Sequence, residues 1–130
     1  SSAASDVYKR QVDCTPEIMV QHDPKWTAEA IGNILDNAVK YTPRGGRVAI
    51  AVRPWQFYTR IDITDTGIGI PEEHYNDVFQ RFYRAQEVAA EEGVGLGLYL
   101  ANGIVTRPKG YISVKSTVGV GTTFSVYLLS

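Results

Sequence analysis

The sequence has a single cysteine, no basic tract and no long apolar run. One cysteine, Cys14, cannot form an internal disulfide, which favours a reducing compartment. With a formal net charge of −1 and no stripe of Lys and Arg, the chain is not typical of proteins that bind nucleic-acid backbones. No apolar run approaches the roughly 20 residues that a membrane-spanning helix needs, and we see no signal-peptide pattern. We therefore expect no nucleic-acid partner and no direct membrane contact.

What the chain does have is enough apolar sequence for one ordinary globular domain, with 130 residues of which 44% are hydrophobic. The first residues, "SSAASDVYKRQ", are small and polar and show no periodicity. We interpret residues 1–15 as a disordered leader or an artificial remnant, and expect residues 16–130 to form the domain.

Hydrophobic periodicity and turn residues indicate the order of the elements. Asp23 can cap a helix whose first position is Pro24, and helical spacing continues to about Tyr41. Further helical patterns cover residues 72–83 and 96–106, while strand patterns cover 17–22, 48–52, 60–65, 110–117 and 121–129. This order predicts an α/β (α+β) two-layer sandwich, with a mixed sheet of about five strands and about three helices on one face. Residues 84–95 have little apolar content, and we expect them to be mobile.

The first long helix carries two separate stripes. One is apolar and recurs at the spacing of a buried face: Ile31, Ile34, Leu35, Ala38 and Val39. The other is polar and is rotated away from the first: Asn33, Asn37, Lys40 and Tyr41. Amide oxygens suit Mg²⁺, and an ammonium group suits a phosphate. The alternative is an ordinary solvated face on which Asp36 and Lys40 form a surface ion pair.

Two glycine-rich runs add to the polar stripe. The first is "DTGIGIP", residues 65–71, directly after a buried strand pattern. The second is "GVGLGL", residues 93–98, just before a helix, where main-chain N–H groups and the helix dipole can hold an anion. No Gly-Lys-Ser/Thr follows the second run, so it is not a Walker loop, and it does not follow a strand as a dinucleotide fingerprint must.

Four motifs in order, "NILDNAVKYTP", "DTGIGIP", "FQRFYRA" and "EGVGLGLYLA", resemble the N box, first glycine box, Phe box and second glycine box of sensor histidine kinases. The catalytic, ATP-binding domain of that family shares a superfamily with gyrase, heat-shock chaperone and mismatch-repair ATPases. The resemblance covers about residues 17–129. It implies the Bergerat fold, with a mobile lid over bound ATP.

The resemblance also implies how the adenine base is held. Asp65 is similar to the carboxylate that accepts a hydrogen bond from the adenine amino group, and Gly67 and Gly69 let the chain turn beneath the purine. Guanine presents an acceptor at that edge, which a carboxylate would repel. The other base contacts implied are a ring partner, two apolar walls and a threonine: Tyr41, Ile68, Ile70 and Thr122.

For the phosphates, the resemblance implies Asn37 as the Mg²⁺ ligand, with Asn33 one turn before it and with Lys40 and Arg84 along the phosphate chain. Asn33, Lys40 and Arg84 are thus the candidate catalytic residues. The lid is expected to contribute the second glycine box: Gly93, Gly95, Leu96, Gly97 and Leu98. Phe79 and Phe82 are expected to position the lid, a role compatible with being simple core aromatics.

Three features depart from the family pattern. Val94 stands where a threonine is common, so a phosphate contact there must come from the main chain. Pro108-Lys109-Gly110 replaces the common His-Gly-Gly. The lid "AQEVAAEEG", residues 85–93, is short and acidic, which should weaken nucleotide affinity unless Mg²⁺ offsets it.

The resemblance implies a protein-histidine kinase fragment that donates the γ-phosphoryl group of Mg-ATP to a histidine on a separate dimerisation domain, with a response regulator downstream. The fragment would be cytoplasmic, within a parent anchored in the inner membrane. A regulatory nucleotide-binding module without efficient transfer, and an anti-sigma-factor-type serine kinase, stay open as alternatives. We interpret His22 and His74 as surface residues, since Pro24 and the adjoining helix do not suit a phosphoacceptor at His22.

Overall fold

The computed structural model describes residues 23–80 and 96–129, together with the backbone of residues 9–14. The sheet consists of β1 (Lys9–Cys14), β2 (Arg47–Trp55), β3 (Tyr58–Asp65), β4 (Tyr111–Thr117) and β5 (Gly121–Leu129). The helical elements are α2 (Pro24–Lys40), α3 (Gly97–Thr106) and two short 3-10 segments, η1 (Glu72–His74) and η2 (Asp77–Phe79).

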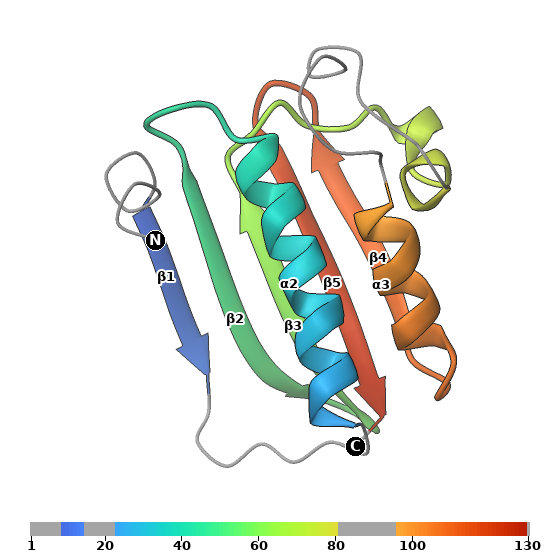
Figure 1. Ribbon diagram of the computed structural model, residues 1–130. Helices are drawn as coiled ribbons and strands as arrows, with labels where there is room; N and C mark the ends of the chain where they lie inside the picture. Colours follow the sequence, from blue (N-terminus) through green and yellow to red (C-terminus); the bar gives the residue numbers. More distant parts are fainter. Residues whose placement is uncertain (1–8, 15–22, 81–95, 130) are drawn as a thin grey trace.

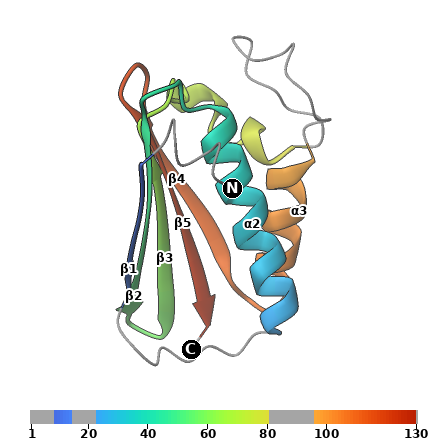
Figure 2. The ribbon, with the colours of Figure 1, turned by 60° about the vertical axis from the view of Figure 1, so that its left-hand side comes forward.

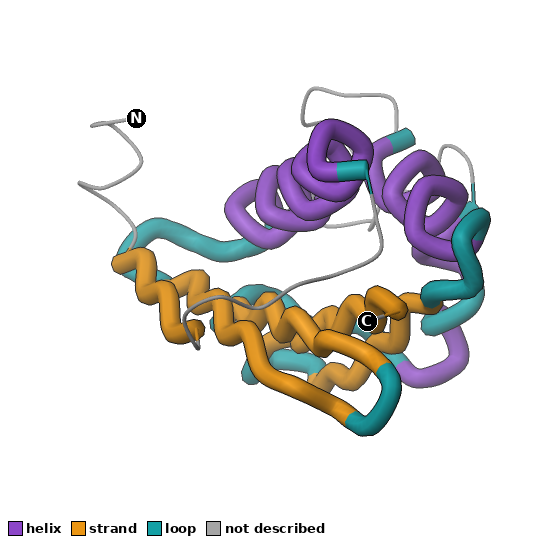
Figure 3. The backbone as a smooth tube through the Cα atoms, turned by 90° about the horizontal axis from the view of Figure 1, so that it is seen from below, coloured by secondary structure: helices purple, strands orange, loops and turns teal. Residues whose placement is uncertain are grey.

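The elements form two layers. The strand order is β1-β2-β3-β5-β4, with β1 parallel to β2 and the other neighbours antiparallel, so the sheet is mixed. Both α-helices cover one face of this sheet, and the other face carries none of the described helices (Figure 1, Figure 3). The predicted two-layer sandwich with a mixed sheet is confirmed.

Helix α2 begins and packs as its sequence predicts. The carboxylate of Asp23 accepts from the main-chain N–H of Lys25 over 2.9 Å, and Pro24 occupies the first turn. Ile34 and Ala38 are fully buried, and the rest of the predicted apolar stripe packs around the core: Ile31, Leu35 and Val39. The helix is therefore held by one apolar face, and its polar stripe is left for other contacts.

The core lies between the helices and the inner face of the sheet (Figure 2). Alternate residues of β3 and β5 point into it, as the period of a strand requires: Ile61, Ile63, Phe124, Val126 and Leu128. Burying each large side chain of this kind contributes about 1.5–3 kcal/mol relative to leaving it exposed. The central strands are consequently the most firmly anchored part of the sheet.

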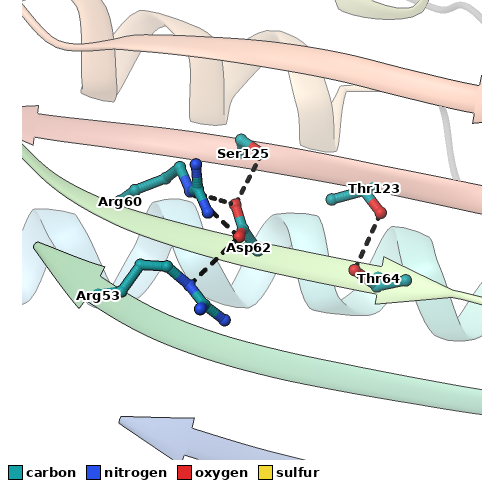
Figure 4. Close-up of polar contacts among 6 residues, drawn as sticks. All are labelled: Arg53, Arg60, Asp62, Thr64, Thr123 and Ser125. Atoms are coloured by element: carbon teal, nitrogen blue, oxygen red, sulfur yellow. Dashed lines mark hydrogen bonds and ion pairs between the residues drawn. The ribbon is translucent and has the colours of Figure 1, made fainter. Parts of the chain in front are cut away.

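The outer face of the sheet is polar near its middle (Figure 4). The carboxylate of Asp62 accepts from the hydroxyl of Ser125 over 2.7 Å and lies 3.1 Å from Nε of Arg60 and 3.7 Å from Nε of Arg53. The hydroxyl groups of Thr64 and Thr123 are 2.9 Å apart across the same two strands, β3 and β5. These cross-strand pairs fix the register of the sheet from its open side.

The structure corrects the expected start of the fold. Residues 9–14 form β1, an edge strand in parallel register with β2, within the stretch interpreted as a disordered leader. The segment "KRQVDC" has only two apolar residues, Val12 and Cys14, and this pattern is too short to predict a strand from the sequence. The strand expected at residues 17–22 lies outside the described residues.

Two other expectations need adjustment. The connection predicted between the strands at residues 53–59 is shorter than expected and is a tight turn at Gln56 and Phe57, with a φ of +53° at Gln56. The reason is that both strands continue beyond the apolar residues from which they were predicted. The single helix predicted over residues 72–83 is instead two one-turn 3-10 segments as far as residue 80. These turns are held by tertiary contacts of Tyr75 and Phe79, and they do not present a continuous helical face.

Candidate functional site

Four elements meet at one end of the sandwich (Figure 1). They are the C-terminal end of α2, the end of β3, the N-terminal end of α3 and the turn between β4 and β5. The main-chain N–H of Ile68 donates to the carbonyl of Tyr41 over 3.2 Å, and the N–H of Gly119 donates to the carbonyl of Ile68 over 2.9 Å. The loop after β3 is thus held between α2 and the β4–β5 turn.

Asp65 lies at the centre of this end and is 5% exposed. Its Oδ1 accepts from the main-chain N–H of Gly67 over 2.8 Å and from that of Thr122 over 3.2 Å. Burial raises the pKa of this carboxyl above its ordinary value of 3.8, and the two hydrogen bonds oppose that rise. Within the described part of the chain, Asp65 belongs to no ion pair and its Oδ2 makes no hydrogen bond. One oxygen of this buried carboxylate is thus an acceptor that no described group uses.

The first glycine run is required by close backbone contacts. A Cβ at Gly67 would lie 2.4 Å from the carbonyl oxygen of Tyr41. Gly69 has a φ of +80°, and a Cβ there would lie 2.4 Å from the carbonyl oxygen of Thr117. Ile68 and Ile70 are half-buried beside these glycines, and Ile70 packs against the core. The loop can approach a flat ligand closely because it carries no side chain at either glycine.

The polar stripe of α2 runs toward this loop. Asn33, Asn37, Lys40 and Tyr41 are all half-buried, and Tyr41 caps the helix with its N–H donating to the carbonyl of Asn37. Nδ2 of Asn33 is buried and has no hydrogen-bond partner among the described residues. The alternative surface pair is not formed, since no described ion pair joins Asp36 to Lys40. The buried amide nitrogen of Asn33 is therefore a donor that no described group uses.

Part of the second glycine run closes the other side of the site. Gly97 begins α3 beside Asn33, and a Cβ there would lie 3.7 Å from the carbonyl oxygen of Asn33. Leu96 precedes it at the N-cap and is half-buried, while Leu98 is buried in the core at 7% exposure. Any ligand contact of Leu98 would therefore come from its main chain. Predicted residues that lie outside the described residues are Arg84, Gly93, Gly95, Val94 and Phe82.

The structure also shows where Phe79 and His74 lie. The ring of Phe79 packs edge-to-face on that of Phe124, with centroids 6.0 Å apart, so this member of the Phe box packs as a core aromatic. His74 lies on the surface with its Nδ1 3.3 Å from a carboxylate oxygen of Asp77. His22 lies outside the described residues.

Sequence reasoning missed Ser116 and Tyr75. The hydroxyl of Ser116 contacts the predicted site residues Ile70 and Thr122, at 2.7 Å in each case, and the hydroxyl of Tyr75 bonds the main chain of Ser116. A signal for Ser116 exists: it follows Ile112 and Val114 on the inward-facing positions of β4, where a polar residue needs a polar partner. Tyr75 has no such signal, because its partner is 41 residues away.

Residues 22–130 match the family described as histidine kinase-, DNA gyrase B- and HSP90-like ATPase. The chain belongs to this ATPase family. It is a histidine kinase-type ATPase domain, since its relatives and the solved structures that it resembles are sensor histidine kinases.

Among the relatives of this ATPase domain is the sensor protein SrrB of Staphylococcus aureus, which is 39% identical over 102 residues. That match covers 77% of this chain and 18% of SrrB, so the chain spans less than a fifth of the length of this relative. The mycobacterial sensor histidine kinase MprB is 32% identical with a TM-score of 0.85, covering 98% of this chain and 85% of the solved chain. Full-length ShkA in complex with AMPPNP shares the fold, with 22% identity, a TM-score of 0.79 and coverage of 95% and 26%.

The ATPase domain contains no helix, within its described residues, that is long and apolar enough to cross a membrane. The same residues hold no group of three or more His, Cys, Asp and Glu side chains that could bind a metal ion.

Proposed function

We propose that the chain is the catalytic, ATP-binding domain of a sensor histidine kinase, and that it donates the γ-phosphoryl group of Mg-ATP to a histidine on a separate dimerisation domain. One observation carries the proposal: Asp65 is buried at the end of β3 with Oδ2 unoccupied by any described group, beside Gly67 and the end of α2. ShkA, of the same fold, is described in complex with the ATP analogue AMPPNP, which supports the choice of ATP as the ligand.

The carboxylate of Asp65 reads the adenine base. Adenine offers an exocyclic N–H₂ group to Oδ2, whereas guanine would place its carbonyl oxygen against a negative charge. The half-buried walls at Ile68 and Ile70 and the ring of Tyr41 supply apolar contact for the purine. Losing a hydrogen bond to a charged group costs about 1.5–3 kcal/mol, so the affinities for ATP and GTP are expected to differ by roughly tenfold or more.

The polar stripe of α2 serves the phosphates. The amide oxygen of Asn37 would hold Mg²⁺, which neutralises charge on the phosphates when bound. Lys40 in the last turn of α2, and Arg84 in the second half of the Phe box, would add positive charge along the phosphate chain. The unpartnered Nδ2 of Asn33 would donate to a further acceptor in the occupied site, such as a phosphate oxygen or a bound water.

A histidine acceptor suits an amide, and not a carboxylate, at Asn33. The amide of Asn33 cannot accept a proton at neutral pH, so it cannot activate water as a carboxylate would. A neutral imidazole needs no base, because one ring nitrogen already carries a lone pair. That nitrogen forms the new bond to the γ-phosphorus, the bond to the bridging oxygen breaks, ADP leaves with the electron pair, and the other ring N–H releases its proton to solvent. The domain supplies position and charge neutralisation.

The remaining parts of the proposal concern the whole protein. Sensor kinases pair such a domain with a histidine-bearing dimerisation domain and pass the phosphoryl group to a response regulator. We assign both partners to this chain, and we place the domain in the cytoplasm within a parent anchored in the inner membrane. Its relative SrrB is named a sensor protein, which supports a role for the parent in signalling.

The test is a transfer assay with ATP labelled at the γ-phosphate, the purified chain and a histidine-bearing dimerisation domain. We expect label on the second domain that is labile to acid and stable to base, and none when its histidine is replaced. Asn37→Ala should abolish transfer, while Asn102→Ala, which changes an asparagine on α3 outside the site, should retain it. Binding of ATP without transfer would instead identify a regulatory module, and acid-stable label on serine would identify a serine kinase.

A further inference from the structure

The hydroxyl of Ser116 stands between three groups of the candidate base pocket. Its Oγ is 2.7 Å from the main-chain N of Ile70, 2.9 Å from the carbonyl oxygen of Gly121 and 2.7 Å from Oγ1 of Thr122. Ile70 belongs to the loop after β3, and Thr122 pairs with Asp65 in the register of β3 and β5. One side chain on the neighbouring strand β4 therefore contacts both sides of the pocket.

The directions of these hydrogen bonds follow from the number of hydrogens. A main-chain N–H can only donate, so Ser116 accepts from Ile70. A carbonyl can only accept, so the single hydroxyl hydrogen of Ser116 goes to Gly121. With that hydrogen committed, the 2.7 Å contact with Thr122 forms only if the hydroxyl of Thr122 donates. Thr122 then has lone pairs, and no hydrogen, left for any other partner.

The position of Ser116 is itself fixed from outside the sheet. The hydroxyl of Tyr75 accepts from the N–H of Ser116 and donates to its carbonyl, both over 2.8 Å. Because β4 lies at the edge of the described sheet, no described strand pairs with these two main-chain groups on that side. Tyr75 takes the place of that strand for one residue and holds Ser116 where it can reach Thr122.

We propose that Ser116 is a positioning residue that determines base specificity, because it holds the hydroxyl of Thr122 as a hydrogen-bond acceptor beside the carboxylate of Asp65. This inference rests on the proposed function, since it assigns that pocket to a purine base. The pocket edge then consists of acceptors alone, from Asp65 and Thr122. It takes a 6-amino purine, directly or through a water, and disfavours a 6-oxo purine.

The test compares the dissociation constants of ATP and inosine triphosphate, which places an oxygen at position 6. The wild-type chain should prefer ATP. In Ser116→Ala the hydroxyl of Thr122 is released, can turn and can donate to the 6-oxo group. The dissociation constant of inosine triphosphate divided by that of ATP should therefore fall by about threefold to tenfold. Ser116→Thr keeps the hydroxyl and should restore the wild-type ratio. Thr122→Val should lower the ratio as well, and adding Ser116→Ala to it should change the ratio no further.

The outcomes separate the two proposals. If the folded Ser116→Ala chain keeps the wild-type ratio, or weakens both nucleotides equally, Ser116 acts only in structure and the inference is overturned while the proposed function stands. If the wild-type chain binds neither nucleotide, both are overturned. Should Ser116→Ala fail to fold, Ser116→Cys makes the same test, because a thiol donates and accepts only weakly; an unchanged ratio there overturns the inference too.

Discussion

Thr122 donates its main-chain N–H to Oδ1 of Asp65 over 3.2 Å, joining β5 to β3 at the end of the sheet where the nucleotide is proposed to bind. The same oxygen accepts from Gly67, and Oδ2 has no partner among the described residues. The two oxygens of one carboxylate thus have different roles. Oδ1 holds the loop to the sheet, and Oδ2 is available to a base.

This division predicts that the two roles of Asp65 can be separated by Asp65→Asn. The asparagine can still accept both main-chain hydrogen bonds, but it carries no buried charge. Burial raises the folded-state pKa of Asp65 above 3.8, so folding favours the protonated carboxyl. The contribution to stability is present below the unfolded-state pKa and is lost as the pH rises through the folded-state pKa. We expect Asp65→Asn to be more stable than the wild-type chain at neutral pH.

The difference in stability should shrink as the pH is lowered toward the ordinary carboxyl range, because the wild-type carboxyl then becomes neutral as well. Urea unfolding of both proteins over a pH series measures it, and groups that titrate identically in the two proteins cancel. A variant that is less stable at neutral pH, or a difference that grows on acidification, would contradict the assignment.

Gly67→Ala should destabilise the domain and weaken ATP binding together. Its Cβ would lie 2.4 Å from the carbonyl oxygen of Tyr41, and backbone must move to admit it. Overpacking of this kind costs about 1–3 kcal/mol. The matched control is Gly103→Ala in α3, where a Cβ meets nothing within 4 Å and should stabilise the helix by about 0.5–1 kcal/mol. Chemical denaturation measures the change in the free energy of unfolding for each substitution, and equal changes for the two would refute the close contact.

Tyr75→Phe should lower the free energy of unfolding by about 1–3 kcal/mol, because the N–H and the carbonyl of Ser116 both lose their partner. Tyr127→Phe is the control, since the hydroxyl of Tyr127 makes no hydrogen bond within the described residues and its ring stacks on Tyr111 in either form. Urea denaturation of the two variants compares them. A negligible effect of Tyr75→Phe would mean that water replaces the phenol at this edge.

The chain alone should hold ATP with little hydrolysis. Asn33 supplies an amide where a base would be needed, and base assistance is typically worth about 10²–10⁴ in rate. Asn33→Asp is nearly isosteric and introduces a carboxylate, so we expect it to raise the release of inorganic phosphate. Phosphate release is measured at saturating Mg-ATP for both proteins. Rapid hydrolysis by the wild-type chain would show that another group activates water.

Much of the fold could be predicted because its signals are local. The capping pair Asp23 and Pro24, the apolar stripe of α2 and the alternation in β3 and β5 each lie within a few residues of sequence. Asp65 could be placed at the end of a buried strand for the same reason. What periodicity cannot supply is the ligand, which came from the resemblance of four ordered motifs.

The features that the sequence did not reveal depend on distant partners. Strand β1 is defined by its register with β2, more than thirty positions further along the chain. The turns at Glu72–His74 and Asp77–Phe79 replace a helix because Tyr75 bonds to Ser116 and Phe79 packs on Phe124. The role of Ser116 follows from the count of donors and acceptors around one hydroxyl, which requires the three-dimensional arrangement.

The most direct test of the account is a calorimetric titration of the wild-type chain and Asp65→Asn with ATP and with GTP, in the presence of Mg²⁺. If Oδ2 of Asp65 reads the adenine amino group, the wild-type chain should bind ATP at least about tenfold more tightly than GTP, and Asp65→Asn should lose a similar factor for ATP while staying folded. Equal affinity of the wild-type chain for the two nucleotides, or unchanged ATP binding by folded Asp65→Asn, would contradict it.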